Sequence, residues 1–553
     1  MDTHRAFVSR IKLHNFKRFC CPNAEFELKP GVNYIVGDNN CGKTSFLQGV
    51  QFALSGDCAG SAVENLIASE DLAGNSFSTY VECEIQYPIK DDAEVQDISC
   101  MQPIAAYASD DPDLPNRIFR FRRYARCSTD DVDGLAQDCI DKLNALNGNY
   151  KAGGIQSKVL IWNADTCEFS IAPKTKDFNE FIQAFCLEAL TQPSEVINGT
   201  TSSVTTKLTE IILGKNGFEE GDAWQEFKQA CSKVKTDPNS GLSCNLDGIG
   251  KQVSELIQER FPGTVIQFSS EYEPSRMDLI KKLSVNVTEN GVTGKLESKG
   301  GGLQRDVAFA LARMHAETSS TGSGFYPQLL LAFDEPENCL HPKAQMALSK
   351  DCVESGRQYI IATHSPYLLT CFNPNSDSCT VLTRDASNSS IVTRQADQLG
   401  IVQPGRPSLA EITYHAFGVP TVEFHSELYG ILHRMAKDEW GAAKAAGAPL
   451  KGDVSCIGDF DKQFLRDRHG LKATDRKRFD DRKYRGDKPF EDCLAETESL
   501  PVWIRNMIDH PESNKKGKDV YPDRAKELNE ITDELLTESI ELLLRIYEDE
   551  RAK

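Results

Sequence analysis

Residues 33–45 constrain the fold more than any other stretch, because an apolar segment runs directly into the pattern Gly-x-x-x-x-Gly-Lys-Thr. Glycines let backbone N–H groups turn inward around phosphate oxygens, the lysine adds positive charge, and the threonine hydroxyl can hold Mg2+. Such a loop needs a strand before it and a helix after it. Leu47, Val50 and Leu54 supply the apolar face of that helix. The sequence therefore predicts a phosphate-binding loop between a strand and a helix.

Length and composition predict a multidomain chain without membrane segments. The 553 residues correspond to about three or four domains at ~150 residues each. No segment approaches ~18 consecutive apolar residues, and the first residues lack the apolar run of a signal peptide. We therefore expect a cytoplasmic protein with no membrane partner.

The eighteen cysteines include no Cys-x-x-Cys pair, which favours reduced thiols over a zinc site. The net charge of -20 argues against a surface that binds nucleic acid everywhere. It leaves a local basic contact possible, because counterion release depends on local phosphate contacts.

Alternating residues predict strands on both sides of the loop. Residues 7–13 and 24–28 precede it, and residues 76–87 and 117–126 follow as antiparallel strands that would flank a parallel sheet. The last of these strands carries five arginines, which either form a solvated face or contact nucleic acid or a partner. These arginines are Arg117, Arg120, Arg122, Arg123 and Arg126.

Residues 178–262 are predicted to form a short helical insertion. Helical patterns lie near residues 178–190, 223–234 and 249–261, separated by Gly, Asn, Asp and Pro. The segment lacks the uninterrupted heptads of a long coiled coil. Strands are expected to return at residues 264–268 and 283–287.

Three later stretches carry chemistry. Residues 298–305, Ser-Lys-Gly-Gly-Gly-Leu-Gln-Arg, open a helix, where serine and glycines either cap the backbone or bind an anion. An apolar strand then ends in Asp334 and Glu335, and carboxylates at a strand's carboxyl end lie at the ligand crevice of a parallel sheet. A third apolar strand, residues 359–363, ends in His364.

With these four stretches in this order, about the first 400 residues resemble the ABC-type ATPases of the SMC, RecF and OLD group. Residues 11–19 are similar to the start of that group, and residues 337–342 to the segment after its Walker B strand. The resemblance implies an α/β fold with a mixed sheet and helices, a short helical insertion and a mainly helical C-terminal domain. The expected domains are 1–177 and 263–402 for the two ATPase parts, 178–262 for the insertion, and 403–553.

The resemblance also implies that ATP and Mg2+ are the cofactors and that two copies of the chain enclose the nucleotide. Lys43 would neutralise phosphates, Thr44 and Asp334 would hold the metal, Glu335 would orient or deprotonate the attacking water, and His364 would contact the γ-phosphate. The nucleotide-binding residues are then Gly37, Asn39, Asn40, Gly42, Lys43, Thr44 and Ser45 of one copy and the signature residues Ser298, Gly300, Gly301 and Gln304 of the other. The signature departs from Leu-Ser-Gly-Gly-Gln, and Gln192 is the candidate for the glutamine loop.

The C-terminal third contains a local basic segment. Residues 462–488 hold eleven lysines and arginines against five aspartates, with Phe464, Phe479 and Tyr484 among them. Such a segment fits a nucleic-acid or acidic-partner surface, or a salt-bridged solvated face.

Residues 503–512, Trp-Ile-Arg-Asn-Met-Ile-Asp-His-Pro-Glu, resemble an element of the PtuA-like ATPases of Septu and retron-linked systems. Those proteins work with a separate PtuB-like HNH nuclease, so the resemblance implies an ATP-gated sensor in antiphage defence. A reverse transcriptase and retron RNA or DNA are further possible partners. A second interpretation of this stretch pairs Arg505 with His510, as in a HEPN-type ribonuclease.

Residues 454–458 suggest a third interpretation, a strand followed by Asp459 and Asp461 in a TOPRIM-like nuclease of the OLD kind. Glu423 or Glu427 would then be the upstream acid, and paired acids could hold two Mg2+ ions. A RecF-like DNA-repair ATPase is the remaining alternative.

Overall fold

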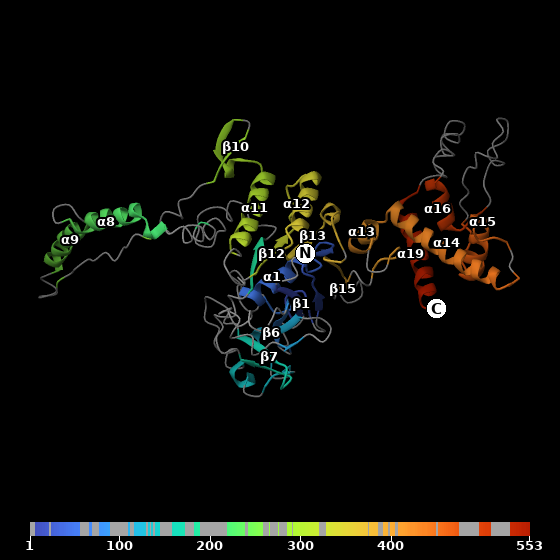
Figure 1. Ribbon diagram of the computed structural model, residues 1–553, viewed down its shortest axis with the longest axis horizontal. Coiled ribbons are helices and arrows are strands. Elements are labelled where there is room, and N and C mark those ends of the chain that lie inside the picture. Colours follow the sequence, from blue (N-terminus) through green and yellow to red (C-terminus); the bar gives the residue numbers. More distant parts are fainter. Residues whose placement is uncertain are drawn as a thin grey trace.

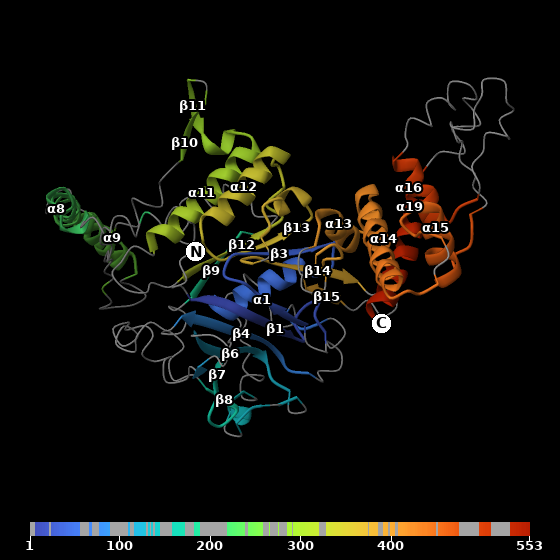
Figure 2. The same cartoon turned by 45° about the vertical axis from the view of Figure 1, so that its right-hand side comes forward.

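The computed structural model places two sheets in separate layers, with one helix between them and further helices outside (Figures 1 and 2). It describes residues 6–20, 24–55, 66–68, 77–88, 109–110, 116–128, 131–132, 134–136, 139–143, 158–171, 182–187, 209, 218–237, 242–257, 265, 275, 285–289, 291–319, 328–373, 375–384, 391–395, 399–403, 407–449, 452–474, 497–509 and 531–553.

The central sheet has the strand order β15-β14-β3-β13-β12-β9. All neighbours in it are parallel except the edge strand β15, which is antiparallel to β14. Parallel strands that are covered on both faces need nearly continuous apolar runs. Its strands are β3 (Val32–Gly37), β9 (Ile182–Leu187), β12 (Gln328–Asp334), β13 (Tyr359–Thr363), β14 (Ser378–Arg384) and β15 (Ile391–Gln395).

The second sheet is antiparallel, with the order β2-β1-β4-β6-β7-β8 and β5 beside β6. Helix α1 (Lys43–Ser55) lies between the two sheets (Figure 2). Its Phe46 and Val50 share one buried cluster with residues of both sheets. The strands are β1 (Phe7–His14), β2 (Ala24–Glu27), β4 (Thr79–Pro88), β5 (Ser109–Asp110), β6 (Asn116–Arg126), β7 (Lys158–Asn163) and β8 (Glu168–Ile171).

Three helices cover the other face of the central sheet. Side chains alternate along β3, so Ile35 packs toward α1 while Tyr34 and Val36 pack toward these helices. A hairpin of β10 (Asn286–Glu289) and β11 (Val292–Lys295) and the short η3 (Leu296–Ser298) lead into the first helix. The helices are α11 (Gly301–Ser319), α12 (Pro342–Glu354) and α13 (Leu409–Phe417).

The C-terminal region is mainly helical and has a core of its own. Its buried cluster includes Leu428, Phe460, Trp503 and Leu543. The elements are α14 (Val422–Ala445), α15 (Ile457–Asp459), the π-helix η6 (Phe460–Arg468), α16 (Leu500–Asp509) and α19 (Asp533–Arg551). The α/β fold predicted from the sequence, with a mixed sheet, helices and a mainly helical C-terminal region, is confirmed.

The helical insertion is only partly as expected. Helices α8 (Asp222–Thr236) and α9 (Leu242–Ile257) lie where two helices were predicted. The helix expected at residues 178–190 is wrong, because residues 182–187 form β9 at the edge of the central sheet, beside β12. A short apolar run does not distinguish a buried strand from a buried helix, and pairing with β12 decides in favour of the strand. The strand expected at residues 264–268 lies outside the described residues, apart from Val265.

The strand expected at residues 454–458 is also wrong. This stretch forms a turn that leads into α15. The Asp453 carboxylate accepts a hydrogen bond from the Ser455 N–H at 2.9 Å, and Asp459 accepts one from the Asp453 N–H at 2.8 Å. Such local side-chain-to-backbone bonds favour a turn over a strand.

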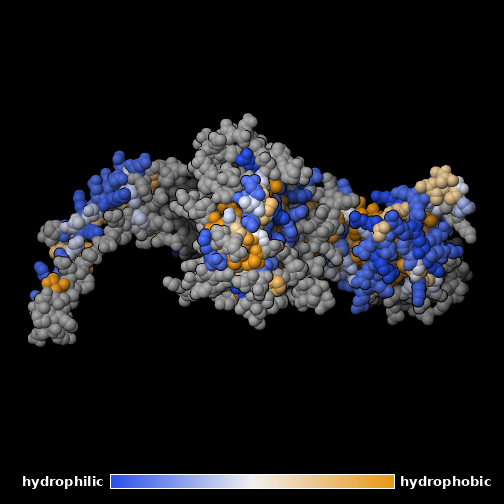
Figure 3. All heavy atoms as spheres, turned by 90° about the horizontal axis from the view of Figure 1, so that it is seen from below, coloured by the Kyte–Doolittle hydropathy of each residue, from blue (hydrophilic) through white to orange (hydrophobic). Residues whose placement is uncertain are grey.

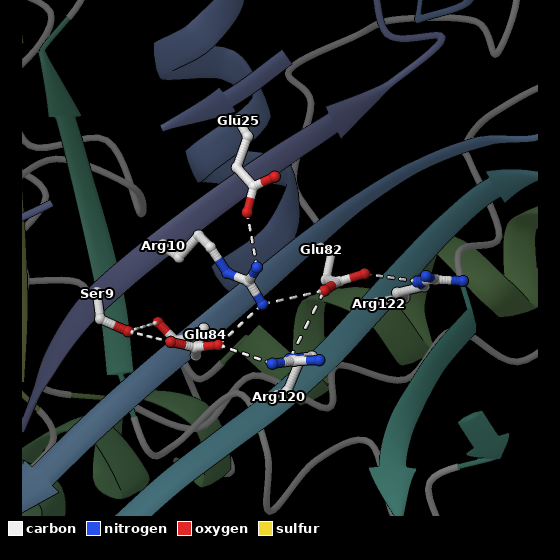
Figure 4. A network of polar contacts seen from close by, with 7 residues as sticks. All are labelled: Ser9, Arg10, Glu25, Glu82, Glu84, Arg120 and Arg122. Atoms are coloured by element: carbon white, nitrogen blue, oxygen red, sulfur yellow. Dashed lines mark hydrogen bonds and ion pairs between the residues drawn. The ribbon is translucent and has the colours of Figure 1, made fainter. Parts of the chain in front are cut away.

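Arg120 and Arg122 of β6 form internal ion pairs. The two interpretations made from the sequence are both wrong for Arg122, which is 9% exposed. Its Nε donates to Glu82 on β4 at 2.8 Å, and its guanidinium lies 4.0 Å from the Phe169 ring centroid. Arg120 contacts Glu84 at 3.1 Å, and Arg10 of β1 joins both acids (Figure 4).

The next arginine of β6 points to the other face of the sheet. Arg123 is 2% exposed, and its Nε donates to the Ala53 carbonyl of α1 at 2.9 Å. Arg123 therefore fixes α1 to the antiparallel sheet.

None of the helices in the described part of the chain has the length and apolar character that a membrane span needs.

We predict that Glu82→Gln lowers the free energy of unfolding by about 3 kcal/mol, because it leaves the buried Arg122 without its charge partner. Glu25→Gln is the matched control. Glu25 accepts from Arg10 at 2.6 Å, but its side chain is 48% exposed, so its loss costs less than about 1 kcal/mol. Urea unfolding of the two variants measures the difference, and equal losses would contradict the assignment.

Candidate nucleotide-binding site

Three neighbouring strand ends build the site. β13 lies between β3 and β12 and is parallel to both. The carboxyl ends of parallel strands meet at one edge of a sheet, where ligands bind. The phosphate loop after β3, the acids Asp334 and Glu335 after β12, and His364 after β13 therefore converge.

The loop after β3 has little room for side chains at its start. A Cβ on Gly37 would lie 2.3 Å from the Leu382 carbonyl oxygen and 2.7 Å from the Cys41 sulfur, and the φ of Gly37 is +154°. Asn39, Asn40 and Thr44 are exposed beyond it, and α1 begins at Lys43. The N-terminus of α1 thus carries its unpaired N–H groups and positive dipole end next to the loop.

Lys43 is buried, and its ammonium lies near two carbonyls, the Cys41 sulfur and an imidazole. Its ammonium donates to the carbonyls of Gly37 and Asp38, both at 3.0 Å, and lies 2.7 Å from His364 Nε2. An ammonium only donates, so a charged Lys43 pairs with the form of His364 that has no proton on Nε2. Burial lowers the pKa of Lys43. Burial, and then the charge of Lys43, lower the pKa of His364.

Thr44 and Asp334 form a pair of oxygen donors. The Thr44 hydroxyl donates to Asp334 Oδ2 at 2.8 Å, and Asp334 is 2% exposed. Mg2+ prefers hard oxygen ligands and is commonly held by one or two protein groups together with substrate phosphates. This donor set fits the metal predicted from the sequence.

Glu335 lies beside His364. Its Oε1 is 3.3 Å from His364 Nε2, and its Oε2 accepts a hydrogen bond from the Asn338 amide at 3.1 Å. The φ of Glu335 is +46°, which is uncommon for a residue other than glycine. Backbone conformations of this kind concentrate at functional sites.

Two residues of the site were missed in the sequence. Glu337 accepts a hydrogen bond from the His364 N–H at 2.6 Å, so it fixes the backbone of His364. Arg305, 5% exposed at the start of α11, donates to the Asp334 carbonyl at 3.2 Å. Glu337 could have been predicted from the sequence, because it lies only two residues after Glu335. Arg305 could not, because its contact depends on how α11 packs.

The signature residues occupy the exposed start of α11. Ser298, Gly300 and Gly301 are exposed, and Gln304 is half-buried. Their described hydrogen bonds stay local: the Ser298 hydroxyl donates to the Lys295 carbonyl at 2.7 Å, and the Gln304 amide to the Lys299 carbonyl at 2.7 Å. The site residues of the phosphate loop, the acids and His364 are thus brought together, and the signature faces outward.

The two aspartates of the TOPRIM-like interpretation, Asp459 and Asp461, form local hydrogen bonds. Asp461 is 5% exposed, and both of its oxygens lie 3.3 Å from the Ser499 N–H, while Asp459 accepts from Asp453 in the turn. Burial raises the pKa of Asp461. Among the described residues, no three His, Cys, Asp or Glu side chains gather as metal ligands. The turn at residues 454–458 thus replaces the strand on which the TOPRIM-like interpretation depended.

The other C-terminal candidates are partly described. Arg505 forms an ion pair with Asp509 at 2.6 Å, and His510 lies outside the described residues. In the basic segment, Arg468 contacts Glu439 at 2.6 Å and Glu550 at 2.9 Å. Arg468 thus belongs to a salt-bridged face. Residues 475–488 and Gln192 lie outside the described residues.

Comparison with known proteins adds a family match. Residues 188–369, less than half of the chain, match the family described as AAA ATPase domain. The match includes the signature, both acids and His364, and it excludes the phosphate loop. None of the proteins with curated functions matches the chain.

Remote structural similarities accompany this match. An SMC head bound to the C-terminal winged-helix domain of ScpA has a TM-score of 0.39 and 16% identity, covering 70% of this chain and 97% of that chain. The SMC head domain from Thermotoga maritima gives 0.31 and 13%, covering 70% and 98%. RecF with ATP gives 0.34 and 14%, covering 68% and 97%.

We predict that Gly37→Ala weakens nucleotide binding about tenfold or more, because strained backbone and a steric clash at this position exceed ~1–3 kcal/mol. Gly430→Ala is the control. Gly430 lies within α14, and nothing would contact its Cβ within 4 Å, so alanine there stabilises the helix by about 0.5–1 kcal/mol. Titration with a fluorescent ATP analogue and thermal unfolding measure both effects. Unchanged affinity in Gly37→Ala would contradict the position of the phosphates.

Proposed function

We propose that the chain binds and hydrolyses ATP and that two copies enclose each nucleotide. One observation carries this proposal: Lys43, Thr44, Asp334, Glu335 and His364 meet at three neighbouring strand ends, with 2.7 Å between Lys43 and His364 and 2.8 Å between Thr44 and Asp334. The match of residues 188–369 to an AAA ATPase domain supports the same chemistry.

Phosphoryl transfer depends on positioning and charge neutralisation more than on covalent chemistry. The backbone N–H groups of residues 37–44 would surround the phosphates, and Lys43 would exchange one of its present acceptors for a phosphate oxygen. Thr44 and Asp334 would hold Mg2+, which supplies further charge neutralisation when bound. The chain thus provides positive charge from one side of the nucleotide.

Hydrolysis also needs an oriented water molecule. Glu335 would accept the proton of that water, since its carboxylate is held by Asn338 and lies beside His364. His364 would contact the γ-phosphate in the form that carries a proton on Nε2, while Glu337 holds its backbone.

The signature residues explain why a second copy is required. Ser298 and Gly300 are exposed just before a 19-residue helix, α11, and Gly301 is exposed as its first residue. A helix N-terminus is a favourable anion site, and Gly300 leaves the backbone open to close approach. These residues would therefore complete the nucleotide site of a neighbouring copy, and dimerisation becomes part of catalysis.

We predict that Glu335→Gln reduces hydrolysis by about a hundredfold or more through loss of the general base. The variant should accumulate as an ATP-bound dimer, as observed by size-exclusion chromatography with light scattering. Lys43→Ala is the control, which should remain undimerised with ATP. Undiminished hydrolysis in Glu335→Gln would refute the assignment.

A mixing experiment separates the two-copy mechanism from a monomeric one. Lys43→Ala and Ser298→Arg should each be inactive. Their mixture should regain activity, because a mixed dimer contains one site with both an intact phosphate loop and an intact signature. A mixture as inactive as its components would contradict the shared site.

Within this activity, we assign the chain to an antiphage defence complex in which it gates an HNH (PtuB-like) nuclease. Support comes from the resemblance of residues 503–512. Trp503 and Ile504 of this element are buried in the C-terminal core, whereas Arg505 and Asp509 pair at its surface. The face of the C-terminal helices shown in Figure 3 is mainly hydrophilic, which suits a polar contact with a partner. A reverse transcriptase with retron RNA or DNA is a further partner in this scheme.

We predict that the purified chain alone cuts neither DNA nor RNA with Mg2+ or Mn2+, and that it copurifies with an HNH protein encoded beside it. Arg505→Ala with Asp509→Ala should weaken the copurification and leave ATP hydrolysis unchanged. The paired replacement avoids an unmatched charge on α16. Nuclease activity of the chain alone would contradict the gating function.

A further inference from the structure

Helix α13 belongs to two cores at once. Ile412 and Ala416 pack in the cluster that covers the central sheet. Ala410 and Tyr414, on the opposite side of the helix, pack against the core of the C-terminal region. A helix shared in this way transmits displacement, because packed interiors have low compressibility.

The ends of α13 are fixed. The Ser408 hydroxyl caps the helix by accepting from the Glu411 N–H at 3.0 Å, and Gly418, with φ +65°, ends it. Glu411 is 1% exposed, and its two oxygens accept from the N–H groups of Gly400 and Ile401 at 2.8 and 3.1 Å. Buried polar groups satisfied in this way hold a helix in one position.

The last residue of α13 contacts the nucleotide site. The Phe417 and His364 ring centroids are 6.2 Å apart, with 37° between the ring planes. At the other side, Tyr414 and His415 contact Phe424 of α14, at 5.1 and 5.8 Å between centroids. Both distances lie within the range of aromatic contacts. Helix α13 therefore joins α14 to His364, with aromatic contacts at both ends of the connection.

We infer that Phe417 is a positioning residue for His364 and that α13 makes ATP hydrolysis depend on the position of the C-terminal helices. The inference rests on the proposed ATPase function. Phe417 touches neither Lys43 nor Asp334 in any described contact, so it acts through His364. A partner that displaces α14 would rotate or shift α13 and move the Phe417 ring, and the imidazole would then leave its position beside Lys43.

The test is steady-state ATP hydrolysis by the full chain. Phe417→Ala should lower kcat about tenfold, because small displacements of a catalytic group reduce rate strongly, while KM for ATP changes less than about twofold. Phe417→Tyr keeps the ring and should retain the kcat of the unaltered chain. Phe417→Leu keeps apolar volume without the ring, so its kcat should be lowered as in Phe417→Ala. Leu409→Ala, at an exposed position of the same helix, is the control with unchanged kcat.

The double variant of Phe417→Ala and His364→Ala tests whether Phe417 acts through His364. In that background, Phe417→Ala should cause no further loss, since the residue acts through the imidazole. Independent losses that multiply would overturn the inference, as would full activity of Phe417→Leu. Absence of ATP hydrolysis from the unaltered chain, alone and with its partner, would instead overturn the proposed function. Circular dichroism and thermal unfolding of each variant confirm that folding is retained.

Discussion

The nucleotide-binding site depends on the hydrogen bonds of β13 to both β3 and β12. They place the phosphate loop, the acids and His364 side by side, although the loop precedes the acids and His364 by some three hundred residues in the chain. Each strand is buried on both faces, so the packing of α1 on one side and α11 to α13 on the other holds the sheet edge rigid. Chemistry that depends on positioning needs such a support.

The charged groups of the site form hydrogen bonds with neighbouring polar groups. Lys43 is matched by two carbonyls and a neutral imidazole, and the acids Glu335 and Glu337 are matched by Asn338 and the His364 backbone. Burial strengthens each of these contacts because the local dielectric is low. Binding of a nucleotide therefore reorganises contacts that already exist, and the histidine participates in both arrangements.

The chemistry-bearing motifs could be predicted from sequence because each is short and requires a fixed strand-to-loop geometry. The loop at residues 37–44 and the strands ending at Asp334 and Thr363 belong to this class. The rest depended on tertiary contacts. Residues 182–187 become a strand only through pairing with β12, and local hydrogen bonds of Asp453 remove the strand predicted at residues 454–458. Arg122 looked exposed because its partner, Glu82, lies on another strand.

The ion pairs of the antiparallel sheet have a consequence for how its strands align. Side chains alternate between the faces with a period of two, so sliding β4 by one residue against its neighbours would turn Glu82 and Glu84 into the apolar layer beside α1. Their arginine partners on β1 and β6 would then remain without counter-charges in the opposite layer. Alternative strand alignments are therefore penalised by buried charge, and the sheet that supports α1 has one permitted register.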